Sequence, residues 1–397
     1  MTEWKTYKIG DLCDTISDTY KGCADEVVLI NTSDVLEGKC LNHTKEPNRN
    51  LKGQFKKTFK KYDILYSEIR PANKRFAYID FDATDYIAST KLMVLRYNEK
   101  IEPLYLYYIL QSQSIIDELQ MLAESRSGTF PQITFTELSR LEVKLPNRDV
   151  QCQILGILGA IDDKIENNRR INTNLELQAQ ALYKQWFVDN RSDNWEEKPL
   201  SEIAEFIGGY SYKGNELVEA SSTAMATIKN FERKGGFKVE GFKDIVASPK
   251  LKAEQHAELF DILVAHTDLT QNADVIGNAE ILLTFGKYSD IIFSMDLVRV
   301  LPKCNFPYKY LLAALLKNPY FKAHCLGYVN GTTVLHMNKK ALPEYVVACP
   351  SNSEAKKMDG AFKAYYQKMA EILQENETLA TLRDTLLPKL MNGEIKL

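Results

Sequence analysis

The sequence lacks the features that most often identify a secreted, membrane-spanning or zinc-binding protein. Its seven cysteines are scattered and never have C-x-x-C spacing, which argues against a disulfide framework or a zinc ribbon. No run of about 18 apolar residues occurs, and the N-terminus lacks the charged-then-apolar pattern of a signal peptide. The five histidines form no i, i+4 pair of the kind that holds zinc. We therefore expect a protein of the reducing cytoplasm without a metal site.

Motifs of methyl transfer and ATP hydrolysis are missing as well. The closest match to an Asn/Asp-Pro-Pro-aromatic motif, NPYF at residues 318–321, lacks the second proline and follows a helix-like segment, so we interpret it as a helix-ending turn. No G-x-x-x-x-G-K-[ST] phosphate loop is present. Residues 142–144 (EVK) could end a nuclease metal site, but no Pro-Asp precedes them at suitable spacing, so we interpret them as a strand. We expect no catalytic residue in this chain.

Positive charge is not in excess, because 50 Lys and Arg stand against 53 Asp and Glu. The net charge of −3 means that any surface for an anionic partner must come from local segregation of charge. The hydrophobic share of 45% and the charged share of 26% are ordinary for a folded globular protein. A length of 397 residues suits two domains of about 150 residues with connecting elements.

An internal repeat organises the chain. Residues 4–16 (WKTYKIGDLCDTI) match residues 195–207 (WEEKPLSEIAEFI), and YDIL at 62–65 matches FDIL at 260–263. The offset grows from 191 at the first match to 203 at a later Gly-Thr pair, and it then stays at 204 from about residue 150. A repeat whose offset drifts only inside the globular parts indicates duplicated units with insertions in their loops.

The constant-offset region carries a heptad pattern in each copy. Steps of four and three residues connect Ile154, Leu158, Ile161, Ile165, Asn168, Asn172, Leu175, Ala179, Leu182 and Trp186. At an offset of 204, the same seam returns as Met358, Phe362, Tyr365, Met369, Ile372, Asn376, Leu379, Arg383, Leu386 and Leu390. This spacing predicts two amphipathic helices of about 35 residues, each about 50 Å long.

The short connection between the first helix and the second globular copy predicts how the helices pair. Only about eight residues separate them, so the second helix must run back to bury its seam against the first. The pair is then antiparallel, and Asn172 and Asn376 lie near the two midpoints. We predict that these two amides approach each other and fix the register of the helices.

The predicted fold is mixed α+β (α/β). Residues 1–150 and 195–352 form two globular units, residues 151–190 and 353–391 form two long antiparallel helices in a coiled coil, and residues 392–397 form a tail. Strand-like runs such as 92–95 and 298–301 and helix-like stretches such as 104–119 and 308–316 support the mixed class.

Basic residues cluster in both units, with aromatic residues interleaved in the first. Such segments suit phosphate contacts, and a solvated charged face is the alternative interpretation. Arg and Asn side chains can also form bidentate contacts with guanine and adenine. The candidates for nucleic-acid binding are Lys56, Lys57, Lys60, Lys61, Arg70, Lys74 and Arg75 in the first unit, and Lys229, Asn230, Arg233 and Lys234 in the second.

Two Gly-Thr loops combine a flexible backbone with hydroxyl donors just before a strand-like run. They could clamp a nucleic-acid backbone or base, or they could be ordinary turns. The candidate residues are Arg126, Gly128 and Thr129 in the first loop, and Gly331, Thr332 and Thr333 in the second.

The chain resembles the DNA specificity subunit of type I restriction–modification systems. Residues 161–189 (IDDKIENNRRINTNLELQAQALYKQWFVD) and 381–397 (TLRDTLLPKLMNGEIKL) are similar to the two helices of that family. KKYDILYS at 60–67, FDILVAHTDLT at 260–270 and the Gly-Thr loops before strands ending at Pro146 and Pro350 also match it. The resemblance therefore covers essentially the whole chain.

The resemblance implies two target recognition domains, each reading one half of a bipartite site in double-stranded DNA, with the helix pair as a ruler. It also implies two modification subunits that bind S-adenosylmethionine and methylate adenine N6, and restriction subunits that use ATP and magnesium. We expect those cofactors in the partners and none in this chain, and we expect no membrane partner. The alternative is an architectural coiled-coil scaffold that assembles partners without reading sequence.

Overall fold

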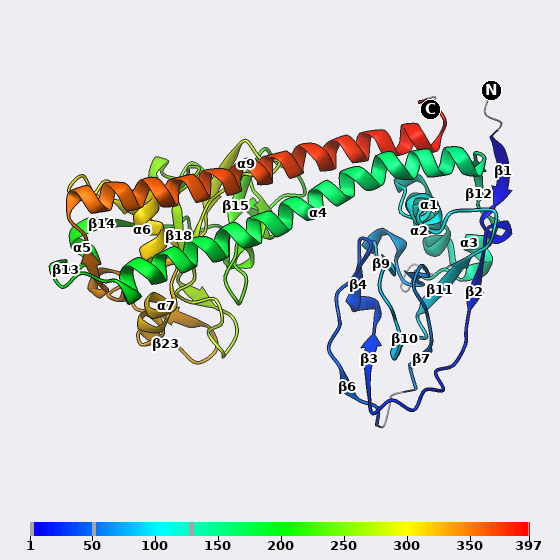
Figure 1. Cartoon of the computed structure of the whole chain (residues 1–397), viewed down its shortest axis with the longest axis horizontal. Coiled ribbons are helices and arrows are strands. Elements are labelled where there is room, and N and C mark those ends of the chain that lie inside the picture. Colours follow the sequence, from blue (N-terminus) through cyan, green and yellow to red (C-terminus); the bar gives the residue numbers. More distant parts are fainter. Residues whose placement is uncertain (1–3, 50–52, 127–130, 396) are drawn as a thin grey trace. The chain divides into compact units, whose positions relative to one another are not determined.

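The computed structural model describes residues 4–49, 53–126, 131–395 and 397. The chain divides into two compact units (Figure 1). The first comprises Met1–Asp163 and Ala380–Leu397, and the second comprises Lys164–Leu379. The long helices α4 (Arg148–Lys184) and α9 (Asn352–Met391) each contribute to both units. The prediction of a mixed α+β fold with two long helices is confirmed.

The first unit is built mainly from short strands. In chain order it contains β1 (Lys5–Lys8), β2 (Cys13–Ile16), β3 (Glu26–Ile30), β4 (Val35–Leu36), β5 (Lys39–Cys40), β6 (Glu46–Pro47), β7 (Phe55–Lys57), β8 (Ile64–Ser67), β9 (Phe76–Tyr78), β10 (Tyr86–Ser89), β11 (Leu92–Tyr97), α1 (Pro103–Leu110), α2 (Gln113–Arg126), α3 (Phe135–Arg140) and β12 (Glu142–Leu145). Its larger sheets have the orders β6-β3-β10-β7 and β2-β11-β8-β9, and β1 pairs with β12.

The second unit has a similar content of strands and short helices. It contains β13 (Glu196–Pro199), α5 (Leu200–Ile203), β14 (Ala204–Gly208), β15 (Thr223–Ala226), β16 (Lys243–Asp244), β17 (His256–Ala257), β18 (Ile262–Ala265), β19 (Thr267–Asp268), β20 (Ala279–Ile281), β21 (Asp290–Phe293), β22 (Leu297–Pro302), α6 (Lys309–Leu316), α7 (Pro319–Leu326), β23 (Val329–Asn330), β24 (Leu335–Met337), α8 (Ala341–Glu344) and β25 (Val346–Cys349). Its sheets have the orders β16-β15-β21-β17, β14-β22-β18-β20 and β19-β24-β23, and β13 pairs with β25.

The two units repeat one topology. Strand β10 runs parallel to β3 in the first unit, as β21 runs parallel to β15 in the second. Strand β8 lies between β11 and β9, as β18 lies between β22 and β20. The antiparallel pairs β1–β12 and β13–β25 join the beginning of each unit to its end. The sequence repeat is therefore a repeat of strand order.

Each unit buries its central strands on both faces. In β8, Ile64 and Tyr66 point to the cluster that includes the helices, whereas Leu65 points to the cluster between the two sheets. In β18, Ile262 and Leu263 divide between two clusters in the same way. Successive strand residues face opposite sides, so strands buried on both faces are continuously apolar, as ILY and ILVA are.

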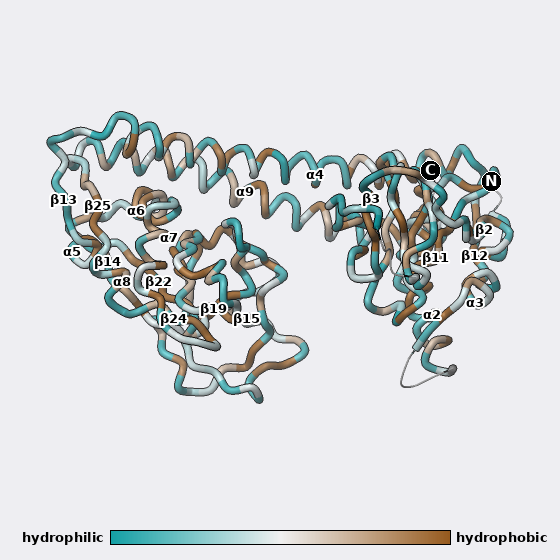
Figure 2. The backbone as a smooth tube through the Cα atoms, turned by 90° about the horizontal axis from the view of Figure 1, so that it is seen from below, coloured by the Kyte–Doolittle hydropathy of each residue, from teal (hydrophilic) through white to brown (hydrophobic). Residues whose placement is uncertain are grey.

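The long helices begin at polar caps that follow a proline. Asn147 follows Pro146 and accepts a hydrogen bond from the backbone N–H of Val150 at the start of α4. Before α9, Ser351 donates its backbone N–H and its hydroxyl to Glu354. Such caps satisfy the free N–H groups of the first turn. The tubes of α4 and α9 alternate between teal and brown in Figure 2, as amphipathic helices do.

Within each unit the two long helices run antiparallel. In the second unit, Asn168 on α4 bonds Asn376 on α9, while Asn172 further along α4 bonds the backbone oxygen of Met369, earlier on α9. In the first unit, Arg383 of α9 donates to Asp162 of α4 at 3.0 Å. The predicted antiparallel pairing is therefore confirmed.

The predicted amide pair was wrong by one helical turn. The side-chain oxygen of Asn376 accepts from Asn168 at 2.9 Å, and the amide nitrogen of Asn172 donates instead to the backbone oxygen of Met369 at 3.2 Å. Heptad spacing identifies the seam but does not set how far one helix slides along the other. A slide of one turn keeps the seam facing inward while changing every partner.

One helix-like stretch is divided in two. The sequence predicts a continuous apolar segment over residues 104–119, but α1 ends at Leu110 and α2 begins at Gln113. The backbone N–H and the hydroxyl of Ser112 both donate to the backbone oxygen of Ile109. Serine competes for backbone hydrogen bonds in this way, which explains the turn between the helices.

Candidate nucleic-acid interface

A buried aspartate anchors the turn before the central strand of the first unit. Asp63 is fully buried, and its carboxylate accepts two hydrogen bonds from the guanidinium of Arg96, at 2.8 and 2.7 Å. The same carboxylate accepts the backbone N–H of Lys60 at 2.9 Å. Tyr62, which lies between Lys60 and Asp63 in the chain, has a φ of 74°, a left-handed conformation that is rare outside glycine. The YDIL motif therefore holds the basic turn in a fixed conformation.

The FDIL motif has the same role in the second unit. Asp261 accepts from Arg299 at 3.0 Å and from the backbone N–H of Glu258 at 2.8 Å. Phe260 has a φ of 68°, like its counterpart in the first unit. Lys309 adds a second ion pair to this carboxylate at 2.8 Å. The repeated motif is thus a structural anchor that orients the residues on either side of it.

Three of the predicted lysines in the first unit face solvent. Lys56 lies on β7, and Lys60 and Lys61 lie in the turn before β8. The ammonium of Lys61 lies 5.1 Å from the ring centroid of Tyr62. These side chains can reach a phosphate backbone without breaking an interaction of the core.

Lys57 faces the other way, so its prediction as a phosphate contact was wrong. Its ammonium donates to the backbone oxygens of Thr90 at 3.0 Å and Leu92 at 2.8 Å. Burial lowers the pKa of this group below its ordinary value. The alternation of side chains along a strand explains the difference from Lys56, because neighbours on β7 point to opposite faces.

The loop after β8 holds two candidate residues in strained backbone conformations. Arg70 has a φ of 45° and Lys74 a φ of 51°, on either side of the one-turn helix Pro71–Asn73. The backbone N–H of Ala72 donates to the side chain of Gln120 on α2 at 3.1 Å. Non-glycine residues in this region cost about 1–3 kcal/mol and persist where surrounding contacts impose them, often at functional loops. Arg70 is exposed on this rigid support.

Arg75 is tied to a neighbouring segment. Its Nη1 donates to the backbone oxygens of Ser33 at 3.1 Å and Val35 at 3.4 Å. This side chain is half-buried, and these two hydrogen bonds stabilise the loop. The bidentate guanine contact predicted for Arg75 would have to compete with them.

In the second unit, a loop closed by pairing of Phe231 with Phe237 carries the basic candidates. We call residues 231–237 the Arg233 loop. Arg233 and Lys234 are exposed, and Nε of Arg233 lies 3.6 Å from the carboxylate of Asp274. Lys229, just before the loop, is also exposed. These cations form a solvent-facing group beside the loop that follows β18.

Asn230 cannot read a base, so this prediction was wrong. Its side chain is fully buried, accepts the backbone N–H of Thr227 at 2.8 Å and donates to the backbone oxygen of Lys238 at 2.7 Å. An Asn at the end of a short helical turn readily bonds the nearby backbone. Asn230 therefore supports the base of the Arg233 loop.

The second Gly-Thr loop is the tight connection between β23 and β24. Gly331 has a φ of 120°, and a Cβ atom there would lie 2.3 Å from the backbone oxygen of Val334. Only glycine fits this position. Thr332 and Thr333 are exposed, and the backbone oxygen of Thr332 accepts from Gln271 at 2.6 Å.

The loop after β18, residues 266–278 with the two-residue strand β19 inside it, brings these candidates together. It contacts the Arg233 loop through Asp274 and the Gly-Thr loop through Gln271. Leu269, in the same loop, is 67% exposed, which is unusual for leucine. Neither Leu269 nor Gln271 was predicted from the sequence. The sequence repeat could have indicated both residues, because this loop is equivalent to the loop after β8, in which Arg70 and Lys74 were predicted.

The first Gly-Thr loop is not described. Gly128, Thr129 and the side chain of Arg126 lie outside the described residues. In the part that is described, Ile69 after β8 pairs with Gln132 beyond that loop, so the two segments meet in the first unit as well.

No helix in the described part of the chain is long and apolar enough to cross a membrane. Across residues 4–49, 53–126, 131–395 and 397, no three His, Cys, Asp or Glu side chains are grouped as metal ligands would be.

Comparisons with known proteins agree with this architecture. Residues 1–177 match the family model described as the type I restriction modification DNA specificity domain. The solved type I restriction-modification S subunit of M. genitalium aligns with a TM-score of 0.54 at 18% identity, covering 98% of this chain and 96% of that one. This likeness supports the fold.

Two curated relatives extend the similarity. The MjaIX specificity subunit of Methanocaldococcus jannaschii is 23% identical over 312 residues, which cover 74% of this chain and 69% of that protein. The HindI specificity subunit of Haemophilus influenzae is 32% identical over an alignment that covers 100% of both chains. This chain belongs to the DNA specificity subunits of type I restriction–modification systems, which recognise DNA sequence and are not themselves catalytic.

Proposed function

We propose that this chain recognises a bipartite DNA sequence, with one half-site read by each unit and the spacing set by α4 and α9. The observation that carries this proposal is the repeated strand order, combined with unlike loops at equivalent places. The loop after β8 presents Arg70 and Lys74, whereas the loop after β18 presents Leu269 and Gln271. A common scaffold with different loops suits two readers of different sequences.

The exposed basic residues serve as phosphate contacts in this proposal. Because phosphate contacts position a protein without reading sequence, they can be similar in both units. Lys56, Lys60 and Lys61 would act in the first unit, and Lys229, Arg233 and Lys234 in the second. Base reading would fall to the loops after β8 and β18 and to the Gly-Thr loops.

The chain acts with DNA and with the methyltransferase and restriction subunits of its system. We propose two modification subunits for each copy of this chain. The repeat supports this number, because each unit presents the same order of elements to a partner. S-adenosylmethionine, ATP and magnesium would be bound by those partners, because the chain lacks the sequence motifs that bind them.

A chimera tests the assignment of one half-site to each unit. Residues 1–150 are replaced by those of a family member with a different target, and methylated sites are mapped in cells that carry the complete system. We expect one half-site to change while the other half-site and the spacer stay the same. Two unchanged half-sites, with methylation intact, would contradict the proposal.

A further inference from the structure

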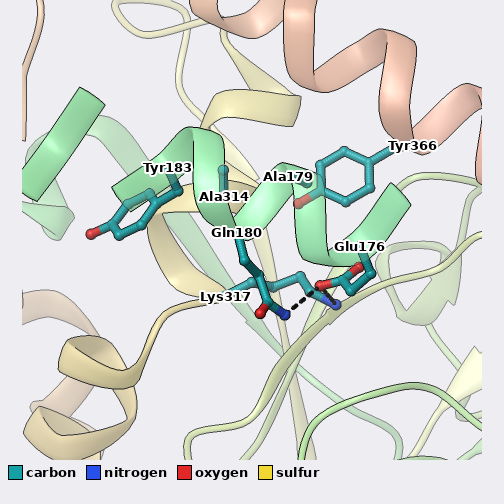
Figure 3. A pocket seen from close by; sticks show the side chains of 7 residues that line it. All are labelled: Glu176, Ala179, Gln180, Tyr183, Ala314, Lys317 and Tyr366. Atoms are coloured by element: carbon teal, nitrogen blue, oxygen red, sulfur yellow. Dashed lines mark hydrogen bonds and ion pairs between the residues drawn. The ribbon is translucent and has the colours of Figure 1, made fainter. Parts of the chain in front are cut away.

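A buried ionic cluster joins α4 to the body of the second unit. Lys317 follows α6 and is only 11% exposed, and its ammonium lies 3.3 Å from the carboxylate of Glu176 on α4 (Figure 3). The same ammonium pairs with Glu280 of β20, which is 4% exposed. Gln180 donates to Glu176 at 3.1 Å, one turn further along α4. We call Glu176, Lys317 and Glu280 the Lys317 cluster.

Stability alone does not explain such a cluster. Burial lowers the pKa of Lys317, but the carboxylates of Glu280 and Glu176 raise it above its ordinary value, so the lysine stays charged. Apolar residues of similar volume often stabilise a fold as well as a buried ion pair does, whereas ionic groups can specify one arrangement over another. The Lys317 cluster is therefore better explained by a role in positioning the groups that it joins.

The first unit has neutral residues at the positions equivalent to the Lys317 cluster. Ala77 pairs with Leu65 in the register in which Glu280 pairs with Leu263. Gln111 directly follows α1 as the cluster's lysine directly follows α6, and Ala380 lies 204 residues after the cluster's α4 carboxylate. All three equivalent residues are neutral. The cluster is thus a feature of the second unit and not a requirement of the repeated fold.

The cluster continues into the Arg233 loop. Glu280 accepts the backbone N–H of Gly236 at 2.6 Å, so one carboxylate holds both Lys317 and this loop. Gly235 and Gly236 have φ values of 90° and 121°, which only glycine adopts readily. Asn278 adds a bond of 2.8 Å to the backbone oxygen of Glu232 at the start of the loop. A continuous polar path therefore runs from α4 to the exposed cations of the loop.

We propose that Lys317 is a positioning residue for recognition by the second unit, because it fixes the Arg233 loop to α4 through Glu280 and Glu176. This inference rests on the proposed function, in which α4 sets the spacing and the Arg233 loop contacts DNA. The helix that measures the spacer then also sets where the second unit's loop meets the DNA.

Glu176→Gln is the sharpest test, because it breaks the tie to α4 and leaves the Lys317–Glu280 pair and the loop in place. Methylation rates of the assembled complex are measured on cognate DNA and on substrates with one altered base pair in either half-site. We expect discrimination at the second half-site to fall by about tenfold, the loss expected when reading of one base pair is removed. Discrimination at the first half-site stays the same.

Two variants separate positioning from stability. Lys317→Arg keeps a cation between both carboxylates and should keep discrimination at the wild-type value. Lys303→Met removes a lysine outside the proposed DNA-contacting loops, whose ammonium donates to the backbone oxygen of Ser201 at 2.6 Å, and should lower the melting temperature without changing discrimination. Equal discrimination by wild type and Glu176→Gln would overturn the inference. A wild-type complex without any half-site preference would instead overturn the proposed function.

Discussion

The amide nitrogen of Asn168 lies 2.9 Å from the amide oxygen of Asn376, and this bond joins α4 to α9 in the second unit. The same nitrogen donates to Glu375 at 2.8 Å, and the ammonium of Lys164 donates to the oxygen of Asn168 at 3.0 Å. A polar residue satisfied inside a helix seam opposes sliding, because any other register leaves it without partners. Asn168 therefore fixes the register of this helix pair.

Asn168 and Asn172 should respond in opposite directions to replacement by leucine. In the described part of the chain, the buried amide oxygen of Asn172 has no hydrogen-bond partner. Asn172→Leu removes that oxygen and should raise the free energy of unfolding by about 1 kcal/mol. Asn168→Leu leaves the partners of Asn168 unsatisfied and should lower the free energy of unfolding by about 1–2 kcal/mol. Urea denaturation measures both, and a stabilising Asn168→Leu would contradict this account of the register.

Asp63→Asn should destabilise the first unit. The variant loses the ion pair with Arg96, whose side chain is 27% exposed, and weakens the turn that presents Lys60 and Lys61. Removing one partner of a fully buried pair costs about 3–5 kcal/mol, and partial exposure of the arginine reduces our expectation to about 2 kcal/mol. Thermal unfolding measures the loss. Asp18→Asn, at an exposed carboxylate, is the control and should have little effect.

The helices could be predicted from the sequence because their pattern is local. Steps of three and four residues and the fixed offset of 204 identified α4 and α9, and polar residues after Pro146 and Pro350 mark where they begin. Strand order could not be predicted in this way. Parallel pairing of β3 with β10 joins segments far apart in sequence, and short apolar runs contain no information about their partners.

The direction of individual side chains was the other limit. Residue type identified Lys57 and Asn230 as possible DNA contacts, but the fold turns one toward backbone carbonyls and buries the other. Leu269 is the reverse case, because leucine is usually buried and this one is 67% exposed. Composition therefore locates the basic segments, but only the fold shows which of their side chains face solvent.

The exposed lysines should account for part of the salt dependence of DNA binding. Replacing Lys56, Lys60 and Lys61 together by glutamine removes up to three phosphate contacts, so the slope of log K against log salt should become less negative by about 0.9 for each phosphate no longer neutralised. Binding of the assembled complex to cognate DNA, measured over a series of salt concentrations, gives this slope. Lys57→Gln is the matched control and should leave the slope unchanged, because its ammonium bonds the backbone. An unchanged slope in the triple variant would show that these three lysines do not contact the DNA phosphates.

Glu216 should contribute stability that depends on pH. Hydrogen bonds from Tyr210, Lys213 and Ser248 lower the pKa of its carboxyl from 4.5 to about 2. A carboxyl with a lowered pKa stabilises the folded state above its unfolded pKa and loses that contribution as the pH falls through the folded value. Glu216→Gln should therefore melt below the wild type at about pH 6, and the gap should narrow as the pH falls from 4.5 to about 2. A gap that does not change with pH would contradict the assignment.

The loop after β18 should supply sequence discrimination without supplying stability. Leu269 is 67% exposed and Gln271 is exposed, so replacing both by alanine should change the free energy of unfolding by no more than about 0.5 kcal/mol. If they contact bases of the second half-site, discrimination there should fall by about tenfold, while the first half-site is read as before. Leu259→Ala is the control, since Leu259 is 45% exposed before β18, at the other end of that strand. Competition between cognate and altered DNA for the assembled complex measures the ratio, and an unchanged ratio in the double variant would show that this loop does not read the sequence.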